Sequence, residues 1–192
     1  MGHPQLIVML TYHDHTVVNV PEIFEACKRS RAQYWGFKED GLPLEQMKEL
    51  FCAMKACGKN TVLEVVAYTE TECLRGARIA VECGCDSLMG TLFYDSDNDY
   101  CKEHGLKNMP FVGCISQRPS VLEGSTEEMI REAETYLREG VYGIDLQSDN
   151  NEKRIRMFLE DNDSPYIAEA GKRILPVFIR PLRCWICRRS RC

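Results

Sequence analysis

Three charged residues interrupt apolar runs, and they are the first residues of this chain that could do chemistry. Glu64 lies inside TVLEVVAY, Asp145 inside GIDL, and Lys38 directly follows WGF. A buried charge is costly unless it is paired or hydrogen-bonded. If the three meet, Lys38 can stabilise a developing enolate while Glu64 or Asp145 acts as the general base. The alternatives are a structural Lys–Glu pair that fills the interior of the fold and a Schiff base on Lys38.

Polar side chains also follow two of the strands predicted below, where we expect them to contact a substrate. A His-x-His pattern after a first strand is also how metal-dependent hydrolase barrels begin, and a divalent ion held with one of the two carboxylates is the alternative. The other histidines, His3 and His104, follow no predicted strand, so we predict no metal and no cofactor. The predicted substrate-binding residues are His13, Asp14 and His15 after the first strand and Ser116 and Arg118 after the fifth.

Apolar runs and helical patterns alternate along most of the chain. Ser125 and Glu128 match a capping box, the strongest helix-start signal in the sequence. Helices are predicted to begin at Pro21, Pro43, Thr71, Asp95 and Ser125, with Gly58, Gly84 and Gly140 as helix-ending residues. Strands are predicted at residues 5–12, 33–38, 61–68, 87–93, 109–115 and 142–146.

This alternation, with a period of roughly 27 residues, is typical of consecutive parallel strand–helix units. It predicts a TIM-type (β/α) barrel, with an open flavodoxin-like sheet as the alternative. A barrel needs eight units and about 250 residues. The sequence shows six clear units, residues 164–168 or 175–179 as a doubtful seventh strand, and no eighth. We therefore predict an incomplete barrel body over residues 1–160 and an atypical segment over residues 161–192.

The charge of the chain divides inside this last segment, at residue 172. The 192 residues include 24 basic and 29 acidic ones, a net charge of -5, and residues 172–192 hold seven basic residues and no acidic one. The overall acidity argues against a nucleic-acid partner. No apolar run reaches the roughly 20 residues needed to cross a bilayer, and the N-terminus lacks a signal-peptide pattern. We expect a cytoplasmic protein with a small-molecule substrate and no membrane partner, and homo-oligomer formation is left open.

Cysteine is frequent, with 11 residues in the chain. The odd count, and the position of most cysteines in apolar-periodic segments, favour reduced and buried thiols over a disulfide framework. Cys184 and Cys187 form a CxxC pair in the basic segment. A zinc ion would need two more ligands there, and redox CxxC pairs belong to a strand-to-helix turn early in a domain, so we interpret this pair as fortuitous.

The segments MLTYHDHTV, YWGFKEDGLP, LEVVAYTE, LMGTLFYD, VGCISQRPSVLEG and GVYGIDL resemble an uncharacterised bacterial (β/α) barrel family related to the ribulose-phosphate-binding barrels. The resemblance covers residues 6 to about 147. It implies a lyase, isomerase or aldolase that acts on a phosphorylated metabolite. Members of this family are sometimes named as 4-hydroxythreonine-4-phosphate dehydrogenases, which would imply a role in pyridoxal phosphate synthesis.

Beyond residue 149 the sequence departs from that family pattern. Phosphate-binding barrels have glycine-rich loops after strands seven and eight, whereas this chain has EAGKR and then RCWICRRSRC. An altered reading frame at the end of the gene is one hypothesis for the departure. Three functions therefore stay open: an enzyme of the phosphate-binding barrel type acting on a phosphorylated or carboxylated metabolite, an inactive or truncated barrel that folds by self-association, and a metal-dependent hydrolase that uses His13 and His15.

Overall fold

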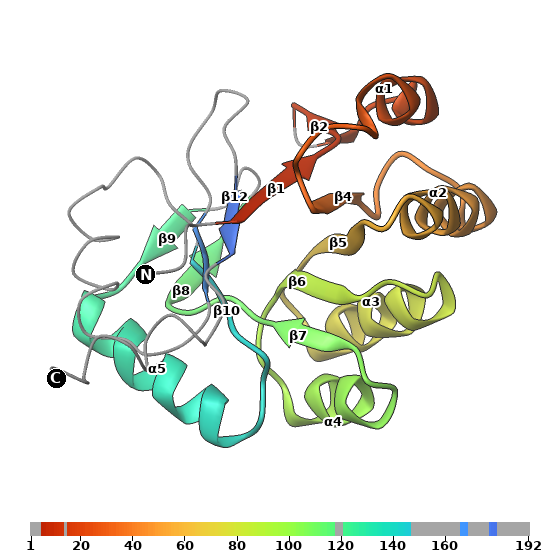
Figure 1. Ribbon diagram of the computed structural model, residues 1–192. Coiled ribbons are helices and arrows are strands. Elements are labelled where there is room, and N and C mark those ends of the chain that lie inside the picture. The colour runs from red at the N-terminus through yellow and green to blue at the C-terminus, as the bar shows by residue number, and fades with distance from the viewer. Residues whose placement is uncertain (1–4, 14, 118–120, 147–165, 169–176, 180–192) are drawn as a thin grey trace, which may run out of the picture.

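The computed structural model describes residues 5–13, 15–117, 121–146, 166–168 and 177–179. Within these residues, five helices lie outside a central sheet: α1 (Val20–Cys27), α2 (Leu44–Ala56), α3 (Glu70–Glu82), α4 (Asp95–Glu103) and α5 (Thr126–Arg138). The sheet strands are β1 (Gln5–Met9), β4 (Tyr34–Lys38), β5 (Asn60–Ala67), β6 (Ser87–Thr91), β7 (Lys107–Met109), β10 (Ile144–Leu146), β11 (Tyr166–Ala168) and β12 (Val177–Ile179). Figure 1 shows α1 to α4 side by side along one flank, with α5 on another.

The sheet has the strand order β10-β11-β12-β1-β4-β5-β6-β7, and its two ends meet. The backbone N–H of Asp145 donates to the carbonyl of Pro110 at 2.8 Å, and Asp145 forms a parallel bridge with Phe111 just after β7. The eight strands therefore close into a barrel, as the sequence predicts. The open flavodoxin-like sheet is wrong, because its end strands would stay apart.

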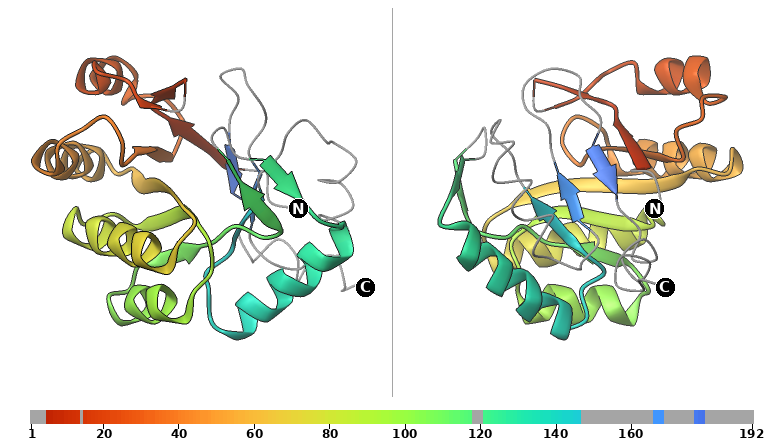
Figure 2. Two further views of the ribbon diagram at one scale, coloured as in Figure 1. Left: turned by 180° about the vertical axis from the view of Figure 1, so that it is seen from behind. Right: turned by 60° about the vertical axis from the view of Figure 1, so that its left-hand side comes forward.

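Along the sheet order, β1, β4, β5 and β6 each pair in parallel with the next strand, as far as β7, and β10 pairs in parallel with β11. In contrast, β12 runs antiparallel to both β11 and β1. The right-hand view of Figure 2 shows these two blue strands between β10 and β1. Five of the six predicted strand–helix units are confirmed, and β10 is the strand of the sixth; residues 147–165, which follow it, lie outside the described residues. Each of the two segments considered for a seventh strand supplies one, but β12 does not have the parallel direction of a regular eighth unit.

Two predicted strands end early and are followed by short hairpins. The predicted strand at 109–115 is divided: β7 ends at Met109, and residues after Gly113 form the hairpin of β8 (Cys114–Ser116) and β9 (Val121–Glu123). Pro110 has no N–H for the ladder, and Gly113 turns the chain with a φ of +83°. The predicted strand at 5–12 likewise ends at Met9 and continues as the hairpin of β2 (Thr11–Tyr12) and β3 (His15–Thr16).

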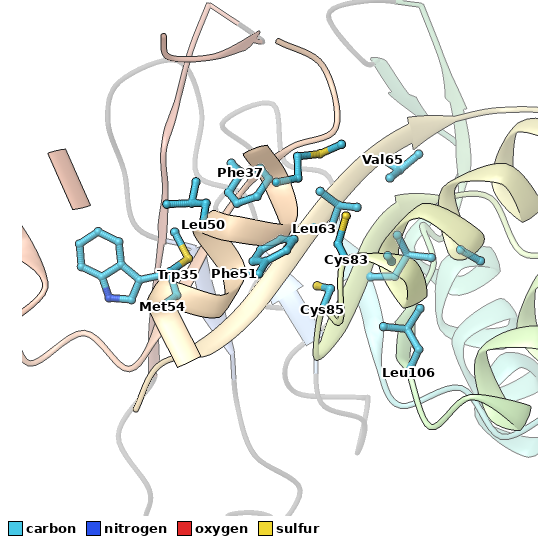
Figure 3. Packing of buried hydrophobic residues seen from close by; sticks show 14 of the residues in the cluster. Trp35, Phe37, Leu50, Phe51, Met54, Leu63, Val65, Cys83, Cys85 and Leu106 are labelled. Carbon is cyan, nitrogen blue, oxygen red and sulfur yellow. The ribbon is translucent and has the colours of Figure 1, made fainter. Parts of the chain in front are cut away.

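The hydrophobic core has an outer layer between sheet and helices and an inner layer inside the barrel. In the outer layer, Leu63 and Val65 of β5 pack with α2 and α3, as Figure 3 shows for Phe51, Met54 and their neighbours. A methyl group at Gly76 of α3 would lie 2.6 Å from Val65 Cγ1, so helix and strand are in close contact. The inner layer consists of Ile7, Val62, Met89 and Met109.

Half of the eight cysteines in the described residues belong to this core. Cys73, Cys83, Cys85 and Cys101 are buried, and all eight are free thiols. Burial raises the pKa of Cys73, Cys85 and Cys101 to about 12. These thiols are small apolar groups of the core, as the sequence indicates. Cys184 and Cys187 lie outside the described residues.

The capping box of α5 is confirmed: Glu128 N donates to Ser125 Oγ at 3.2 Å, and Ser125 N donates to Glu128 Oε2 at 2.8 Å. Within the part of the chain that the structure describes, no helix has the length and apolar character needed to span a membrane. Apart from β11 and β12, residues 161–192 lie outside the described residues. The division of the chain at residue 160 stays a prediction.

Candidate active site

The candidate site is centred on a buried ion pair between two neighbouring parallel strands. Lys38 is the last residue of β4 and lies opposite Glu64 of β5. Lys38 Nζ is 3.0 Å from Glu64 Oε1, and the two side chains are 10% and 7% exposed. Such a pair keeps both groups charged in a place where either charge alone would be strongly unfavourable.

The pair points into the barrel. Glu64 is two residues after Val62, so the two side chains share one face of β5. Val62 packs with Ile7, Met89 and Met109, which come from β1, β6 and β7 and form the inner layer. The ion pair therefore lies directly above an apolar floor, toward the C-terminal ends of the parallel strands. Active sites of barrel enzymes lie at this end.

A β-bulge beside Glu64 sets the shape of this part of the sheet. The register of β5 and β6 shifts between Glu64 and Ala67, and Gly90 lies opposite the shift with a φ of +89°. A methyl group at Gly90 would lie 2.9 Å from the carbonyl oxygen of Val65 and 3.3 Å from Glu64 Cγ. Glycine is therefore required by both the backbone conformation and the space beside the carboxylate.

The backbone of Lys38 is held by a residue that the sequence analysis missed. The Oγ1 of Thr16 donates to the carbonyl of Lys38 at 2.7 Å and accepts the Lys38 N–H at 2.9 Å. Thr16 is buried, and these bonds tie the β2–β3 hairpin to the end of β4. The hairpin is therefore a fixed part of the wall next to the ion pair.

The predicted histidine cluster lies on this hairpin, where His13 contacts Tyr12 and His15 contacts Asp40. His15 Nδ1 is 2.8 Å from Asp40 Oδ2, and both side chains are mostly exposed. His13 occupies the turn with a φ of +49°, and its ring contacts that of Tyr12 with centroids 4.0 Å apart. Asp14 lies outside the described residues. Among the residues that the structure describes, no three His, Cys, Asp or Glu side chains gather to hold a metal ion.

Asp145, the third predicted catalytic residue, comes from β10 and is completely buried. Its strand lies beside β7, where Asp145 N binds Pro110 O. Lys38 and Glu64 are thus brought together as predicted, while Asp145 enters the barrel wall from the far side of β6 and β7. The catalytic role of each residue stays a prediction.

The β8–β9 hairpin carries the remaining predicted residues. Ser116 is half-buried at the end of β8, opposite Val121, and Arg118 lies outside the described residues. Tyr68, which directly follows β5, donates its hydroxyl to the carbonyl of Gln117 at 2.7 Å. Gln117 has a φ of +68°, so this bond holds a strained backbone position. Tyr68 has no distinctive sequence signal, because a tyrosine after a buried strand is common.

Comparisons with known proteins support the fold. No family model matches the chain, and no curated protein matches its sequence. The 3-dehydroquinate dehydratase from Aquifex aeolicus VF5 superposes with a TM-score of 0.59 at 15% identity, covering 86% of this chain and 78% of that chain. A 4-hydroxy-2-oxoglutarate aldolase/2-deydro-3-deoxyphosphogluconate aldolase from TTHB1 gives a TM-score of 0.57 at 12% identity, with 88% and 73% covered.

Tryptophan synthase from M. tuberculosis gives a TM-score of 0.56 at 16% identity, covering 87% of this chain and 74% of that chain. All three identities are too low to carry an activity across to this chain. They show that the chain has a TIM-barrel fold.

Proposed function

We propose that this chain is an enzyme of the phosphate-binding barrel type, a lyase, isomerase or aldolase that acts on a small phosphorylated or carboxylated metabolite. The observation that carries the proposal is the Lys38–Glu64 pair, 3.0 Å apart and buried toward the C-terminal ends of the strands. Supporting this, similar solved structures include an aldolase and a dehydratase.

The pair has the two groups that enolate chemistry requires. The ammonium of Lys38 donates to a carbonyl or carboxylate oxygen of the substrate and stabilises the negative charge that develops there. The carboxylate of Glu64 accepts the proton from the adjacent carbon. When substrate enters, the ammonium exchanges part of its interaction with Glu64 for the substrate oxygen, which leaves the carboxylate a stronger base. Asp145 is the alternative base on the opposite part of the wall.

A second buried lysine provides a natural control. Lys59 is as buried as Lys38, at 8% exposure for each. Its Nζ donates to the carbonyls of Ser30 and Ala32 at 2.9 and 2.8 Å, just before β5 begins. This is the N-terminal end of the barrel, where buried polar residues serve stability. Lys59 therefore has the burial and charge of Lys38 without its position.

The proposal is tested by a thermal-shift screen of the full chain against sugar phosphates and 2-oxo acids. A ligand that binds the folded state raises the Tm. We expect at least one compound to stabilise the wild type and Lys59→Met, each relative to its own baseline, and to leave Lys38→Met and Glu64→Gln unchanged. Stabilisation of all four proteins, or of none by any compound, would contradict the proposal.

The remaining interpretations stay predictions with tests of their own. Metal analysis of the purified protein tests the hydrolase that uses His13 and His15. Light scattering tests self-association, and a dehydrogenase assay with 4-hydroxythreonine 4-phosphate tests the role in pyridoxal phosphate synthesis.

A further inference from the structure

A second buried polar cluster lies outside the barrel wall, under the first turn of α4. Asp97 is completely buried there, and Asn98 and Asn108 beside it are almost so. Asp97 Oδ1 accepts the backbone N–H of Tyr94 at 2.9 Å, and Asp97 Oδ2 accepts Asn108 Nδ2 at 3.3 Å. The reaction proposed above does not use this cluster, since the side chains of β7 that face the helices are on the opposite side from its inner-layer residues.

The cluster has fewer donors than it needs. Within the described residues, Asn98 Oδ1 and Asn108 Oδ1 are buried without a hydrogen-bond partner. The orientation of Asn98 is fixed, because its Nδ2 donates to the carbonyl of Glu139 at 2.9 Å. The orientation of Asn108 is fixed only while Asp97 is ionised and requires a donor. A buried acceptor without a donor costs about 1–3 kcal/mol. The donors that bind the Asp97 carboxylate at these distances are neutral N–H groups, so a proton on Asp97 would remove a completely buried charge.

The same residues join α4 to the start of β10. The carbonyl of Asn108 accepts the backbone N–H groups of Tyr142 and Gly143 at 3.0 and 3.4 Å. Asn98 holds Glu139, the residue that ends α5. Asn108, which binds Asp97, therefore also holds Tyr142 and Gly143, and β10 begins directly after them.

We propose that Asp97 is a proton-binding site that couples α4 to the start of β10. On protonation, the carboxyl group takes one proton from solvent and donates it in a hydrogen bond to Asn108 Oδ1. The Asn108 amide rotates by half a turn to exchange its oxygen and nitrogen. No covalent bond of the chain changes.

The surroundings of Asp97 favour this proton. Burial raises the pKa of Asp97 to about 6, although hydrogen bonds from Tyr94 and Asn108 oppose the increase. The titratable side chains that sense its charge in the described residues are the thiols of Cys73 on α3 and Cys101 on α4, and both stay neutral. Lys102, the cation on this part of α4, pairs with Asp99 at 2.6 Å. Asp97 is therefore the group of the cluster that changes charge near neutral pH.

NMR titration of the full chain tests the proposal directly. The side-chain carboxyl carbon of Asp97, the side-chain amide of Asn108 and the backbone amides of Tyr142 and Gly143 are followed from about pH 4 to pH 8. We expect all four to shift with one midpoint near pH 6. An Asp97 midpoint near 4, or an Asp97 titration that leaves Tyr142 and Gly143 unchanged, would overturn the proposal.

Two matched variants complete the experiment. Asp97→Asn should abolish the shifts of Asn108, Tyr142 and Gly143 at this midpoint. Asp99→Asn makes the same substitution on an exposed position of the same helix and should retain them. Loss of the transition in both variants would mean that general charge on α4 is responsible, which contradicts a specific site. Because the wild-type titration stands alone, the test does not depend on the folding of Asp97→Asn.

Discussion

Replacing Lys38 by methionine tests whether the ion pair is as desolvated as its position indicates. The side chain of methionine fills most of the space of the lysine stem but removes the ammonium. Glu64, 7% exposed, then keeps a carboxylate whose cation at 3.0 Å is lost. Removing one partner of a buried pair costs about 3–5 kcal/mol, because the other charge stays in the interior.

The distance between the two charged groups gives an interaction energy of similar magnitude. Two unit charges 3.0 Å apart attract each other by about 5 kcal/mol at an effective dielectric constant of about 20. An exposed pair, in contrast, contributes about 0–1 kcal/mol. The two cases differ by several kcal/mol, so a stability measurement can separate them.

The assay is urea denaturation at neutral pH, followed by the fluorescence of buried Trp35. Lys38→Met and Glu64→Leu are measured alone and together in a double-mutant cycle. We expect each single variant to lose about 3–5 kcal/mol and the double variant to lie close to the wild type, since both buried charges are then absent. Lys59→Met provides a comparison at an equally buried lysine.

A coupling energy below about 1 kcal/mol would refute this reasoning, because it is the value of a solvated surface pair. A change in the m-value would mean that the unfolded state has changed as well, and the cycle would then be repeated by thermal unfolding.

Three further predictions concern residues that support the site and the fold. Between pH 4 and 6 the folded state keeps a proton on Asp97 that the unfolded chain, with a pKa near 3.8, has released. The contribution of Asp97 to the free energy of unfolding should therefore fall by about 3 kcal/mol as the pH rises through this range, measured as the difference between the wild type and Asp97→Asn in denaturation experiments. Gly90→Ala should lower the free energy of unfolding by about 1–3 kcal/mol in denaturation experiments, because φ is +89° and the added methyl group meets Val65 O. Gly58→Ala should lower it by less, because the space around Gly58 is open, although its φ is +72°. Ser125→Ala should lower the free energy of unfolding by about 1 kcal/mol through the lost cap of α5; an unchanged value would mean that the capping box contributes nothing.

The sequence predicts the parallel strands of this barrel because the local sequence pattern and the tertiary packing agree there. TVLEVVAY is apolar on both faces, as a parallel strand covered on both sides must be, and β5 is found at that place. The pairing of Lys38 with Glu64 could be anticipated because consecutive strand–helix units place their strands side by side in a parallel sheet. The chain direction of β12 could not, because a short apolar run does not state which neighbour it will join.

The supporting contacts of the site were not predictable from local patterns. Thr16 binds Lys38 from 22 residues away, and nothing in HDHT distinguishes it from an exposed threonine. The bulge opposite Gly90 depends on how β5 and β6 meet. Asp97 belongs to a short polar helix that would be typical of a surface, and it is buried because α4 packs on both α3 and β7. Each of these features depends on long-range contacts.

The most direct test of the central claim is solvent deuterium exchange at the carbon next to a carbonyl group. The full chain is incubated in D2O with 2-oxo acids and sugar phosphates, and loss of the substrate proton is followed by NMR. The account predicts exchange of at least one compound with wild-type protein and with Lys59→Met, and a loss of about 100-fold or more with Glu64→Gln, in line with the contribution of a general base. Equal exchange by Glu64→Gln and the wild type, or no exchange of any compound, would contradict a proton-transfer role for the Lys38–Glu64 pair.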